Sequence, residues 1–534
     1  MLSLHDRGYH ADASRLVKGN KGKSMSQNRA DVVIAGGGPN GLMLACELAL
    51  GGVQPVVLER LRAPSDEIKA NGLVGQVVRA LDIRGLYHEF SGDPQPPRAL
   101  DGWMFAGIPV RFLGVPDNPM YTLPIPQPRL VALLERRAHT LGVDIRWGHE
   151  LTGIAGSDGE LELTVTAEGK VYEIGATYLV GADGGRSFVR KSAGIDFPGV
   201  TTLTVSRMAD VHVADELRTA DGGIHIPGFG PIPLGRPTRT DGGTFVFFDL
   251  YGSTWVATAE LGTGPSDETP MTLEELRESA RRVLGVDLPF EPPRGPGPHR
   301  LRRIVGQNTR QADRYRSGNV FLVGDSAHVH SPIGGPGLNL GLQDVMNLGW
   351  KLAAAAKGIA PIGLLDTYQS ERHPVGERVM MHSLAQLALT LPAPEISGLR
   401  DLLEELLQVP GAAEHVAHLL AGSDVRYDVG DNHRLAGRFL PDLTLADGRR
   451  VAELLHHARP VLLDLSGGHA VAAAQDWQGR IEALVSAIPD CPLSALLIRP
   501  DGYVAWAADA FESGDDIRLR AALRRWFGEG GTSA

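Results

Sequence analysis

The chain has 534 residues, a length that predicts several domains rather than a single core. Its 63 acidic and 52 basic residues give a net charge of −11 without a large block of either sign, which argues against a nucleic-acid partner. No uncharged apolar run reaches the ~18 residues of a membrane-spanning helix, and Glu47 interrupts the first apolar helix, so no membrane association is expected.

The cysteines and the N-terminal segment bear on the compartment. Cys46 and Cys491 form no C-x-x-C pair, which excludes a disulfide framework and a cysteine-based zinc site. We expect both to be buried as small hydrophobes. Residues 1–30 are polar and mildly basic, and we interpret them as a disordered leader without a secretory signal. These features predict a cytoplasmic protein.

Residues 31–59 have the pattern of a strand–turn–helix–strand unit. A buried strand is predicted for 31–35, a helix for 42–50 and a second strand for 56–58, which ends at Glu59. The turn at 36–41 reads G-G-G-P-N-G and fits the dinucleotide-binding pattern G-x-G-x-x-G.

Each residue type in this unit has a physical reason. Gly36 permits a tight turn, Gly38 lets the backbone approach a pyrophosphate, and Gly41 lets the helix pack on the strand. The helix N-terminus favours phosphate. Glu59 lies 18 residues beyond Gly41, where it can bond ribose hydroxyls and would repel a 2′-phosphate. The unit therefore predicts a site for FAD or NAD rather than NADP.

A second glycine-rich turn follows the predicted strand 178–180. Residues 181–187 read G-A-D-G-G-R-S, which places Asp183 and Arg186 at the tip of the turn. On these residues alone, a plain hairpin or strand-to-helix turn explains the pattern equally well.

The third motif is richer. A strand is predicted for 319–323, followed by Asp325 and by a glycine-rich loop that opens a long helix with Leu342 and Val345 on its apolar face. Glycines at a helix N-terminus expose backbone donors for negative charge, and Asp325 can accept a bond from a sugar hydroxyl. His328 and His330 lack further ligands nearby, so no metal site is predicted.

Together, G-x-G-x-x-G, G-A-D-G-x-x-S and G-D-S-A-H-x-x-x-P-x-G-G-x-G-L-N resemble the class A flavoprotein monooxygenases, typified by para-hydroxybenzoate and phenol hydroxylases. The order and spacing agree over most of residues 31–375, and the most similar branch is that of the aromatic polyketide hydroxylases. The resemblance implies that FAD is bound by Gly36, Gly38, Pro39, Gly41, Glu59, Arg60, Lys69, Gln127, Asp183, Arg186, Asp325, Pro332, Gly335, Gly337, Leu338 and Asn339.

Two positions depart from the family pattern. Lys69 stands where the family usually has Arg, and it lacks the planar fork of a guanidinium. Pro336 stands where the family usually has Gln, which removes a side-chain amide and a backbone donor.

The resemblance also implies the fold, an α/β chain with three parts. A FAD-binding, Rossmann-like domain of the para-hydroxybenzoate hydroxylase type would take residues 31–100, 125–200 and 300–390. An inserted, mainly antiparallel β substrate domain would take 101–124 and 201–299, with β-rich runs at 244–249 and 253–259 and a Gly/Pro-rich loop at 222–235. After a linker marked by Pro392 and Pro394, helices are expected in 399–420, within a C-terminal thioredoxin-like domain (399–534) without redox cysteines. There, strands 460–465 and 494–498, a turn at Asp501-Gly502 and a helix at 515–527 are predicted.

The implied activity is an FAD- and NAD(P)H-dependent monooxygenation of a polycyclic aromatic, polyketide-type substrate by O₂. Ring hydroxylation through a flavin C4a-hydroperoxide, in antibiotic biosynthesis, is favoured. Alternatives are a Baeyer–Villiger oxidation of a polyketide ketone, a flavin reductase or dehydrogenase, and a non-catalytic FAD-binding protein. No acid, base or nucleophile stands out as catalytic, because this chemistry belongs largely to the cofactor. The pattern fits a monomer or a homodimer.

Overall fold

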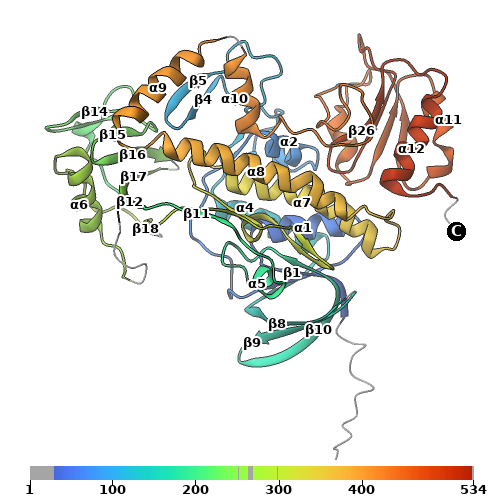
Figure 1. Cartoon of the computed structure of the whole chain (residues 1–534), viewed down its shortest axis with the longest axis horizontal. Coiled ribbons are helices and arrows are strands. Elements are labelled where there is room, and N and C mark those ends of the chain that lie inside the picture. The colour runs from blue at the N-terminus through green and yellow to red at the C-terminus, as the bar shows by residue number, and fades with distance from the viewer. Residues whose placement is uncertain are drawn as a thin grey trace, which may run out of the picture.

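The computed structural model describes residues 29–157, 159–250, 252–262, 269–297, 299–409 and 411–531. The first strand, β1 (Arg29–Ala35), begins two residues earlier than predicted, so residues 29 and 30 do not belong to a leader. The rest of the predicted leader lies outside the described residues. The predicted fold class is confirmed: an α/β domain carries an inserted antiparallel β domain, and a smaller α/β domain follows (Figure 1).

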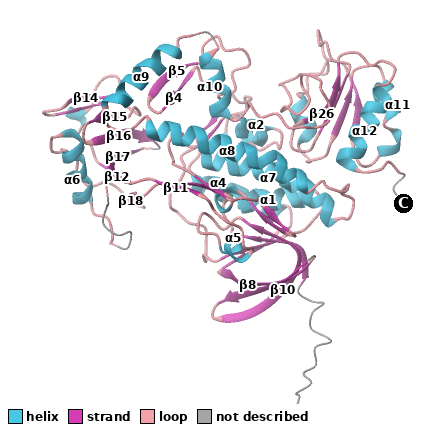
Figure 2. Cartoon of the chain, in the orientation of Figure 1, coloured by secondary structure: helices cyan, strands magenta, loops and turns pink. Residues whose placement is uncertain are grey.

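The core of the first domain is a sheet with five neighbouring parallel strands. Val32, Val33 and Ile34 are fully buried, as expected for a parallel strand covered on both faces. Antiparallel strands extend the sheet into a ribbon that curves away from the helices (Figure 2). The sheet runs in the order β20 (Arg316–Ser317), β21 (Val320–Leu322), β10 (Lys170–Gly181), β1, β2 (Val56–Glu59) and β7 (Asp144–Trp147), with β8 (His149–Ser157) and β9 (Glu160–Ala167) joined through β10.

Helices cover this sheet. The helix α1 (Pro39–Leu50) packs against α4 (Gln127–Thr140) and α7 (Pro336–Ala356), and α8 (Asp366–Ala388) lies beside α7 (Figure 1). Smaller elements complete the domain: β3 (Leu73–Val74), α2 (Gln76–Asp82), α3 (Tyr87–Ser91), β6 (Thr122–Leu123), α5 (Phe188–Ser192), β11 (Gly199–Thr201), β19 (Asn308–Gln311) and β22 (His328–Val329).

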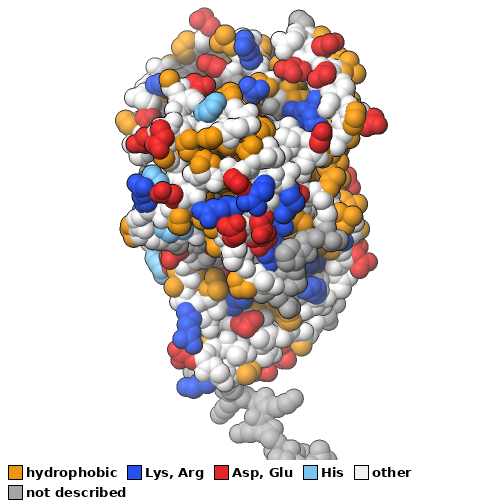
Figure 3. All heavy atoms as spheres, turned by 90° about the vertical axis from the view of Figure 1, so that its left-hand side faces the viewer, with side chains coloured by type: hydrophobic (Ala, Val, Ile, Leu, Met, Phe, Trp, Pro, Cys, Tyr) orange, Lys and Arg blue, Asp and Glu red, His pale blue; other side chains and the backbone are white. Residues whose placement is uncertain are grey.

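The inserted domain is an antiparallel sheet in the order β15 (Thr238–Thr240), β16 (Gly243–Leu250), β17 (Ser253–Leu261), β12 (Thr204–Val211) and β18 (Leu301–Val305). One face packs on α6 (Leu273–Leu284), where Phe245, Phe247 and Val256 are buried. The predicted loop at 222–235 is wrong in part. It contains a hairpin of β13 (Ile224–Ile226) and β14 (Gly230–Ile232), because Ile224, Ile226 and Ile232 are buried against this core. On this side of the molecule basic side chains lie beside acidic ones (Figure 3).

The predicted linker and helix boundaries near residue 394 are also wrong. Pro394 is the first residue of α9 (Pro394–Leu406), a position where proline is favoured because its missing N–H has no helical partner. The helices α9 and α10 (Ala412–Ala421) contribute to a cluster with the hairpin β4 (Gly102–Phe105) and β5 (Ile108–Arg111). They therefore pack beside the inserted part of the chain rather than on the C-terminal sheet (Figure 1).

The C-terminal domain has a mixed sheet in the order β24 (Glu482–Val485), β23 (Val461–Asp464), β25 (Ala495–Ile498) and β26 (Val504–Ala508). The predicted turn between β25 and β26 is confirmed, with Gly502 at φ 85°. The helices α11 (His469–Ala473) and α12 (Asp515–Phe527) cover the sheet. Cys46 is buried as expected, but Cys491 is only half-buried.

Candidate functional site

Four strands of the first domain end in one row. Ala35 of β1 pairs with Gly181 of β10 on one side and with Leu58 of β2 on the other, and Gly181 pairs with Leu322 of β21. The three glycine-rich motifs, and Glu59 at the end of β2, follow these residues in the chain. The structure therefore brings all four segments to the carboxyl edge of one parallel sheet, the place where α/β folds bind ligands.

The glycines of the first motif have three different surroundings. A Cβ on Gly36, which has φ 118°, would lie 2.3 Å from the carbonyl oxygen of Ala182, so this glycine permits contact with the second motif as well as the predicted turn. A Cβ on Gly41 would lie 1.9 Å from the Gly36 oxygen, as expected for close packing of helix on strand. A Cβ on Gly38 would meet nothing within 4 Å. Gly38 caps α1, and Pro39 is its first residue.

Glu59 holds the turn of the first motif. Its Oε2 accepts a hydrogen bond from the Gly37 amide at 2.8 Å, and its Oε1 accepts one from Leu61 at 2.9 Å. Arg60 is exposed beside it. The carboxylate thus lies against the dinucleotide turn, where the spacing predicted it.

Asp183 caps the short helix of the second motif. Its Oδ2 accepts hydrogen bonds from the amides of Phe188 (2.7 Å) and Val189 (3.0 Å), while its Oδ1 is buried without a partner in the described part of the chain. Arg186 is exposed.

Arg190, which joins the second and third motifs, was not predicted as a site residue. Its guanidinium donates to the carbonyl oxygens of Gly185 (3.0 Å) and Ser326 (2.8 Å) and stacks 3.8 Å from the ring centre of Phe197. Only its position four residues after Arg186 could have suggested a role.

Asn40 connects the first and third motifs and was also missed. A Cβ on Gly324 would lie 2.0 Å from Asn40 Nδ2, and one on Gly341 would lie 2.5 Å from it. Asn40 Oδ1 is buried and has no partner among the described residues. A side chain at either position would therefore displace the Asn40 amide from its place between the two motifs.

Asp325 follows β21 and is open to solvent, although many protein atoms surround its carboxyl group. Desolvation by the surrounding protein raises its pKa, although the nearby charges of His328 and Lys69 oppose the shift. Lys69 in turn lies 3.4 Å from Glu67. Lys69 thus forms an ion pair within its own segment, and its charge is the smaller of the two that oppose the pKa shift of Asp325. Gln127 is the first residue of α4 and lies next to the segment that contains Lys69, since its backbone N–H donates to the Ala70 oxygen at 2.9 Å.

The glycine-rich loop of the third motif turns into α7. Gly334 and Gly335 have φ of 79° and 69°, and Pro336 is the first helical residue. This position explains the departure from Gln, because proline suits the first turn of a helix. Asn339 accepts a hydrogen bond from the Val74 amide and donates to the Gly335 oxygen, both at 3.1 Å.

The remaining predicted residues of this loop follow the same path. The Gly335 amide donates to the oxygen of the exposed Pro332 at 3.0 Å. Gly337 lies against His330, whose ring atoms would be 3.3 Å from a Cβ there. Leu338 is half-buried against the core.

The inserted sheet was predicted to belong to the substrate domain, but the prediction did not say which of its faces lines the site. We call the side opposite α6 the inner face, and strand alternation assigns to it Ser206, Met208, Asp210, Thr244, Val246, Phe248, Trp255, Ala257, Ala259, Arg302 and Ile304. Most of these side chains are only half-buried, whereas the α6 face is buried. Phe248 stacks on Trp255, with ring centres 4.5 Å apart.

Three contacts join the inner face to the first domain. Ser206 accepts a hydrogen bond from Gln307 (3.0 Å), whose amide oxygen accepts one from Ser331 in the third motif (2.6 Å). Arg302 lies 3.4 Å from Glu67, beside the Lys69 segment. Thr244 donates to the Thr390 oxygen just after α8 at 3.3 Å.

The predicted His pair has a different use. His328 Nε2 lies 2.6 Å from Asp344 Oδ2, and both side chains are buried. In the described ranges no group of three or more His, Cys, Asp or Glu residues is placed to hold a metal ion.

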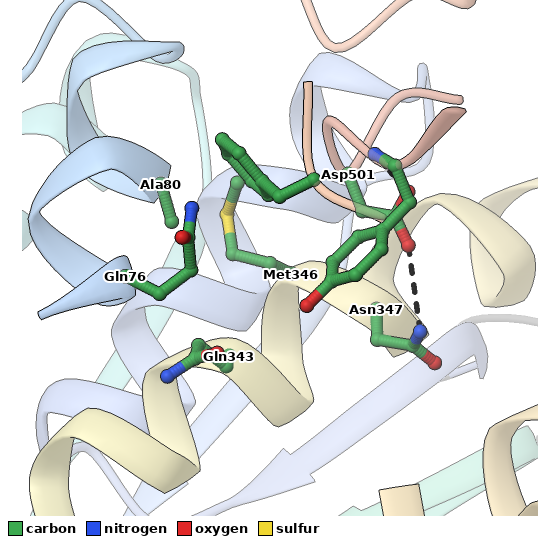
Figure 4. A pocket seen from close by; sticks show the side chains of 8 residues that line it. Gln76, Ala80, Gln343, Met346, Asn347 and Asp501 are labelled. Atoms are coloured by element: carbon green, nitrogen blue, oxygen red, sulfur yellow. Dashed lines mark hydrogen bonds between the residues drawn. The ribbon is translucent and has the colours of Figure 1, made fainter. Parts of the chain in front are cut away.

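A small pocket between α7 and the C-terminal domain does not compete with this site. Gln76, Gln343, Met346, Asn347 and Asp501 are among its lining residues (Figure 4). Its volume of about 10 Å³ leaves room for at most one water molecule.

Among the described residues, no helix has both the length and the apolar character that are needed to cross a membrane.

The strand edge fits a flavin dinucleotide. The free space at Gly38 lies at the N-terminus of α1, where backbone donors and the helix dipole suit a pyrophosphate. Asn40 Oδ1 and Asp183 Oδ1 are buried acceptors without a protein partner in the described residues, and such atoms call for a donor. Hydroxyl groups of a ribose or ribityl chain are donors of that kind.

Comparisons with known proteins agree with this geometry. Residues 29–383 match the family described as FAD binding domain, and residues 433–530 match the family described as Aromatic-ring hydroxylase, C-terminal. The 12-dehydrotetracycline 5-monooxygenase/anhydrotetracycline 6-monooxygenase of Streptomyces rimosus is 41% identical over 94% of this chain and 99% of its own. The dialkyldecalin synthase of Streptomyces rugosporus is 36% identical over 93% of this chain and 98% of its own. The solved structure of OxyS anhydrotetracycline hydroxylase from Streptomyces rimosus aligns with a TM-score of 0.82 and 39% identity, covering 94% of this chain and 100% of the other.

Proposed function

Because the chain belongs to the FAD-dependent aromatic monooxygenases, we propose that it inserts one atom of O₂ into a polycyclic aromatic, polyketide-type substrate, with NADPH or NADH as the reductant. Ring hydroxylation is the outcome we favour. We further propose that the protein acts in the cytoplasm, as a monomer or homodimer.

The observation that carries this proposal is the row of four strand ends. It gathers the free space beside Gly38, a carboxylate at Glu59, an unpartnered acceptor on Asp183 and the solvent-accessible Asp325 along one edge of the described sheet. Such a row suits an extended dinucleotide, with one end at the first motif and the other at the third.

We assign the predicted residues to FAD in that order. The ADP half would contact the first motif, the last residue of β2 and the residue that follows it. These residues are Gly36, Gly38, Pro39, Gly41, Glu59 and Arg60. Asp183 and Arg186 would lie beside the middle of the cofactor and the transient nicotinamide. Asp325 would accept a hydrogen bond from the ribityl chain, with Lys69 and Gln127 on the adjoining segment. The ring would lie against the loop formed by Pro332, Gly335, Gly337, Leu338 and Asn339.

When bound, FAD would supply the chemistry that the side chains lack: two-electron exchange with the nicotinamide and activation of O₂ for transfer of one oxygen atom. The residues of this chain bind FAD, orient the substrate and enclose both. Backbone amides at the start of α7 stabilise negative charge next to the ring. The inner face holds the substrate on the other side: Val246 and Ala257 form its apolar centre, and the stacked Phe248 and Trp255 offer a flat surface to a further ring. No side chain is required as acid, base or nucleophile.

A second candidate reaction is favoured by one observation. A relative that matches nearly the whole chain is named a dialkyldecalin synthase rather than a monooxygenase. The same flavin site and inner face could therefore serve a ring closure without a gain of oxygen, because an apolar face that orients a substrate suits either reaction.

One experiment separates these outcomes. NADPH and NADH consumption is followed under ¹⁸O₂ with a panel of polycyclic phenols and quinones, and each product mass is recorded. One added ¹⁸O atom with stimulated consumption supports monooxygenation, and the product structure then distinguishes hydroxylation from Baeyer–Villiger ring expansion. An open-chain polyene is added to the panel for the ring closure, and its conversion to an isomer of unchanged mass supports that reaction. Flavin-dependent consumption with another acceptor and no labelled product refutes the monooxygenase proposal.

A substitution on the inner face tests the substrate surface. In Ala257→Trp the indole fills the centre of that face, and we expect substrate-stimulated turnover to fall by at least about tenfold, while FAD affinity stays within about twofold of wild type. Val171→Trp introduces the same side chain at an exposed position of β10 and serves as the control. Equal turnover of the two variants would remove the inner face from the substrate site.

A further inference from the structure

Arg372 of α8 bonds two residues of α7 that follow the third motif. It is fully buried, its Nε donates to Asp344 Oδ1 at 2.8 Å, and its Nη2 donates to the Leu340 oxygen at 3.3 Å, in the first turns of α7. Asp344 Oδ2 accepts the amide of Gly324 at 3.3 Å and lies 2.6 Å from His328 Nε2. One guanidinium thus supports both the residue before Asp325 and the start of the helix behind the glycine loop.

The charge on Asp344 is maintained by these same partners. Desolvation opposes ionisation, but the charges of Arg372 and His328 together with their hydrogen bonds lower the pKa of Asp344 below its usual value. A carboxylate that accepts from a guanidinium, a ring N–H and an amide is fixed in position, because every displacement weakens several charge-assisted bonds at once.

The third partner of Arg372 comes from outside the first domain. Its Nη1 donates to the Tyr427 hydroxyl at 3.0 Å. Tyr427 belongs to the core of the C-terminal domain: its ring lies 4.3 Å from that of Tyr503, and its amide donates to the Gly437 oxygen at 2.8 Å. A chain of hydrogen bonds therefore runs from the C-terminal domain through Arg372 and Asp344 to Gly324.

We propose that Tyr427 is a positioning residue for FAD: through Arg372 and Asp344 it fixes the backbone on both sides of the glycine-rich loop, so that the C-terminal domain sets the affinity of the first domain for its cofactor. This inference rests on the proposed function, since it assumes that the third motif contacts FAD. It gives the C-terminal domain, which has no C-x-x-C pair, a part in cofactor binding.

A neighbouring network of the same junction provides a control. Lys351, Glu371, Arg499 and Asp501 join α7 and α8 to the C-terminal domain, with Lys351 Nζ 2.7 Å from Glu371 Oε2 and Arg499 bound to Glu371 at 2.6 and 2.9 Å. Within the described part of the chain, Lys351 Nζ donates to Asn347 and Glu371, neither of which belongs to the third motif. Lys351→Met therefore weakens the junction and leaves the chain from Tyr427 to Gly324 in place.

The test compares FAD dissociation constants and apoprotein melting temperatures for wild type, Tyr427→Phe, Lys351→Met and Tyr172→Phe. Tyr172 bonds Arg146 and His149 in the β8–β10 ribbon and gives the matched loss of a phenol hydroxyl. We expect Tyr427→Phe to raise the FAD Kd by at least about fivefold, because a buried guanidinium N–H loses its acceptor, and the two control variants to stay within about twofold.

Hydrogen exchange of the apoprotein gives a second readout that does not depend on FAD. Protection of the segment containing Gly324 should fall in Tyr427→Phe and be kept in Lys351→Met. An unchanged Kd in Tyr427→Phe, or an equal rise in Lys351→Met, overturns the inference and leaves the proposed function standing. A wild-type protein that binds no FAD overturns the proposed function itself.

Discussion

Gly38→Ala separates cofactor binding from folding. Gly38 has φ −77° and ψ −177°, an extended conformation open to alanine, and its added Cβ would meet no protein atom within 4 Å. Two small effects on the free energy of unfolding oppose each other. Replacing glycine stabilises by about 0.4–1 kcal/mol through the unfolded chain, while alanine is a poorer helix cap than glycine by a similar amount. The stability of the apoprotein should therefore change by less than about 1 kcal/mol.

The effect on FAD should be much larger. The methyl group enters the space that we assign to the pyrophosphate, and overpacking a close contact costs about 1–3 kcal/mol, or roughly a 5- to 150-fold rise in Kd. The assay is titration of apoprotein with FAD, followed by flavin fluorescence, together with thermal unfolding without FAD, because bound ligand would itself raise the melting temperature.

Gly398→Ala is the control for this variant. Gly398 lies on the exposed part of α9, and its added Cβ also meets nothing within 4 Å. It should raise stability by about 0.5–1 kcal/mol and leave the Kd unchanged. Wild-type FAD affinity in Gly38→Ala would mean that the space beside this glycine is not the pyrophosphate site.

Two further predictions concern buried charges. Arg84→Met leaves Glu47 buried without the guanidinium that now binds both its oxygens at 2.7 Å, so the free energy of unfolding in urea should fall by about 3–5 kcal/mol. Adding Glu47→Gln to this variant should restore part of the loss. A fall below about 1 kcal/mol in Arg84→Met would contradict the prediction. Desolvation opposes ionisation of Glu371, but Arg499 and Lys351 lower its pKa to about 2 from an ordinary 4.5, so its contribution is complete above the unfolded value and is lost as the pH falls toward 2. The stability gap between wild type and Glu371→Gln should therefore narrow by roughly 3 kcal/mol between about pH 5 and pH 2 in chemical unfolding, and a gap independent of pH would refute the assignment.

The strand–glycine–helix units could be predicted from the sequence because their signals are local. A short apolar run followed by closely spaced glycines determines a strand end and a helix start within about a dozen residues. Parallel strands then place their carboxyl ends at one edge, so the motifs that follow them meet. Boundaries were less secure. The hairpin at 222–235 was missed because its glycines and prolines outnumber the three isoleucines that pack into the core. Pro394 was interpreted as part of a linker, although it is the first residue of a helix.

The residues that the sequence did not reveal are those whose partners lie far along the chain. Arg190 bonds Ser326, 136 residues away, and Tyr427 is 55 residues from Arg372. Glu47 looked only like an interruption of an apolar helix, whereas it is the partner of Arg84. The inner face escaped because alternation predicts that a strand has two faces but does not say which one the other domain covers.

The buried charges at the domain junction explain why the C-terminal domain has one fixed position relative to the first domain. The flavin edge is built mostly from backbone donors, whereas the domain junction and the chain leading from it to the third motif bury three acids and three bases: Asp344, Glu371, Asp501, Lys351, Arg372 and Arg499. Buried ion pairs add little net stability compared with apolar side chains of the same size. What they add is a single geometry, because Arg499 satisfies Glu371 and Asp501 together in one placement only, whereas an apolar contact tolerates sliding. A fixed placement is the condition under which Tyr427 can hold Arg372, so the network that joins the domains is also what allows the junction to support the cofactor loop.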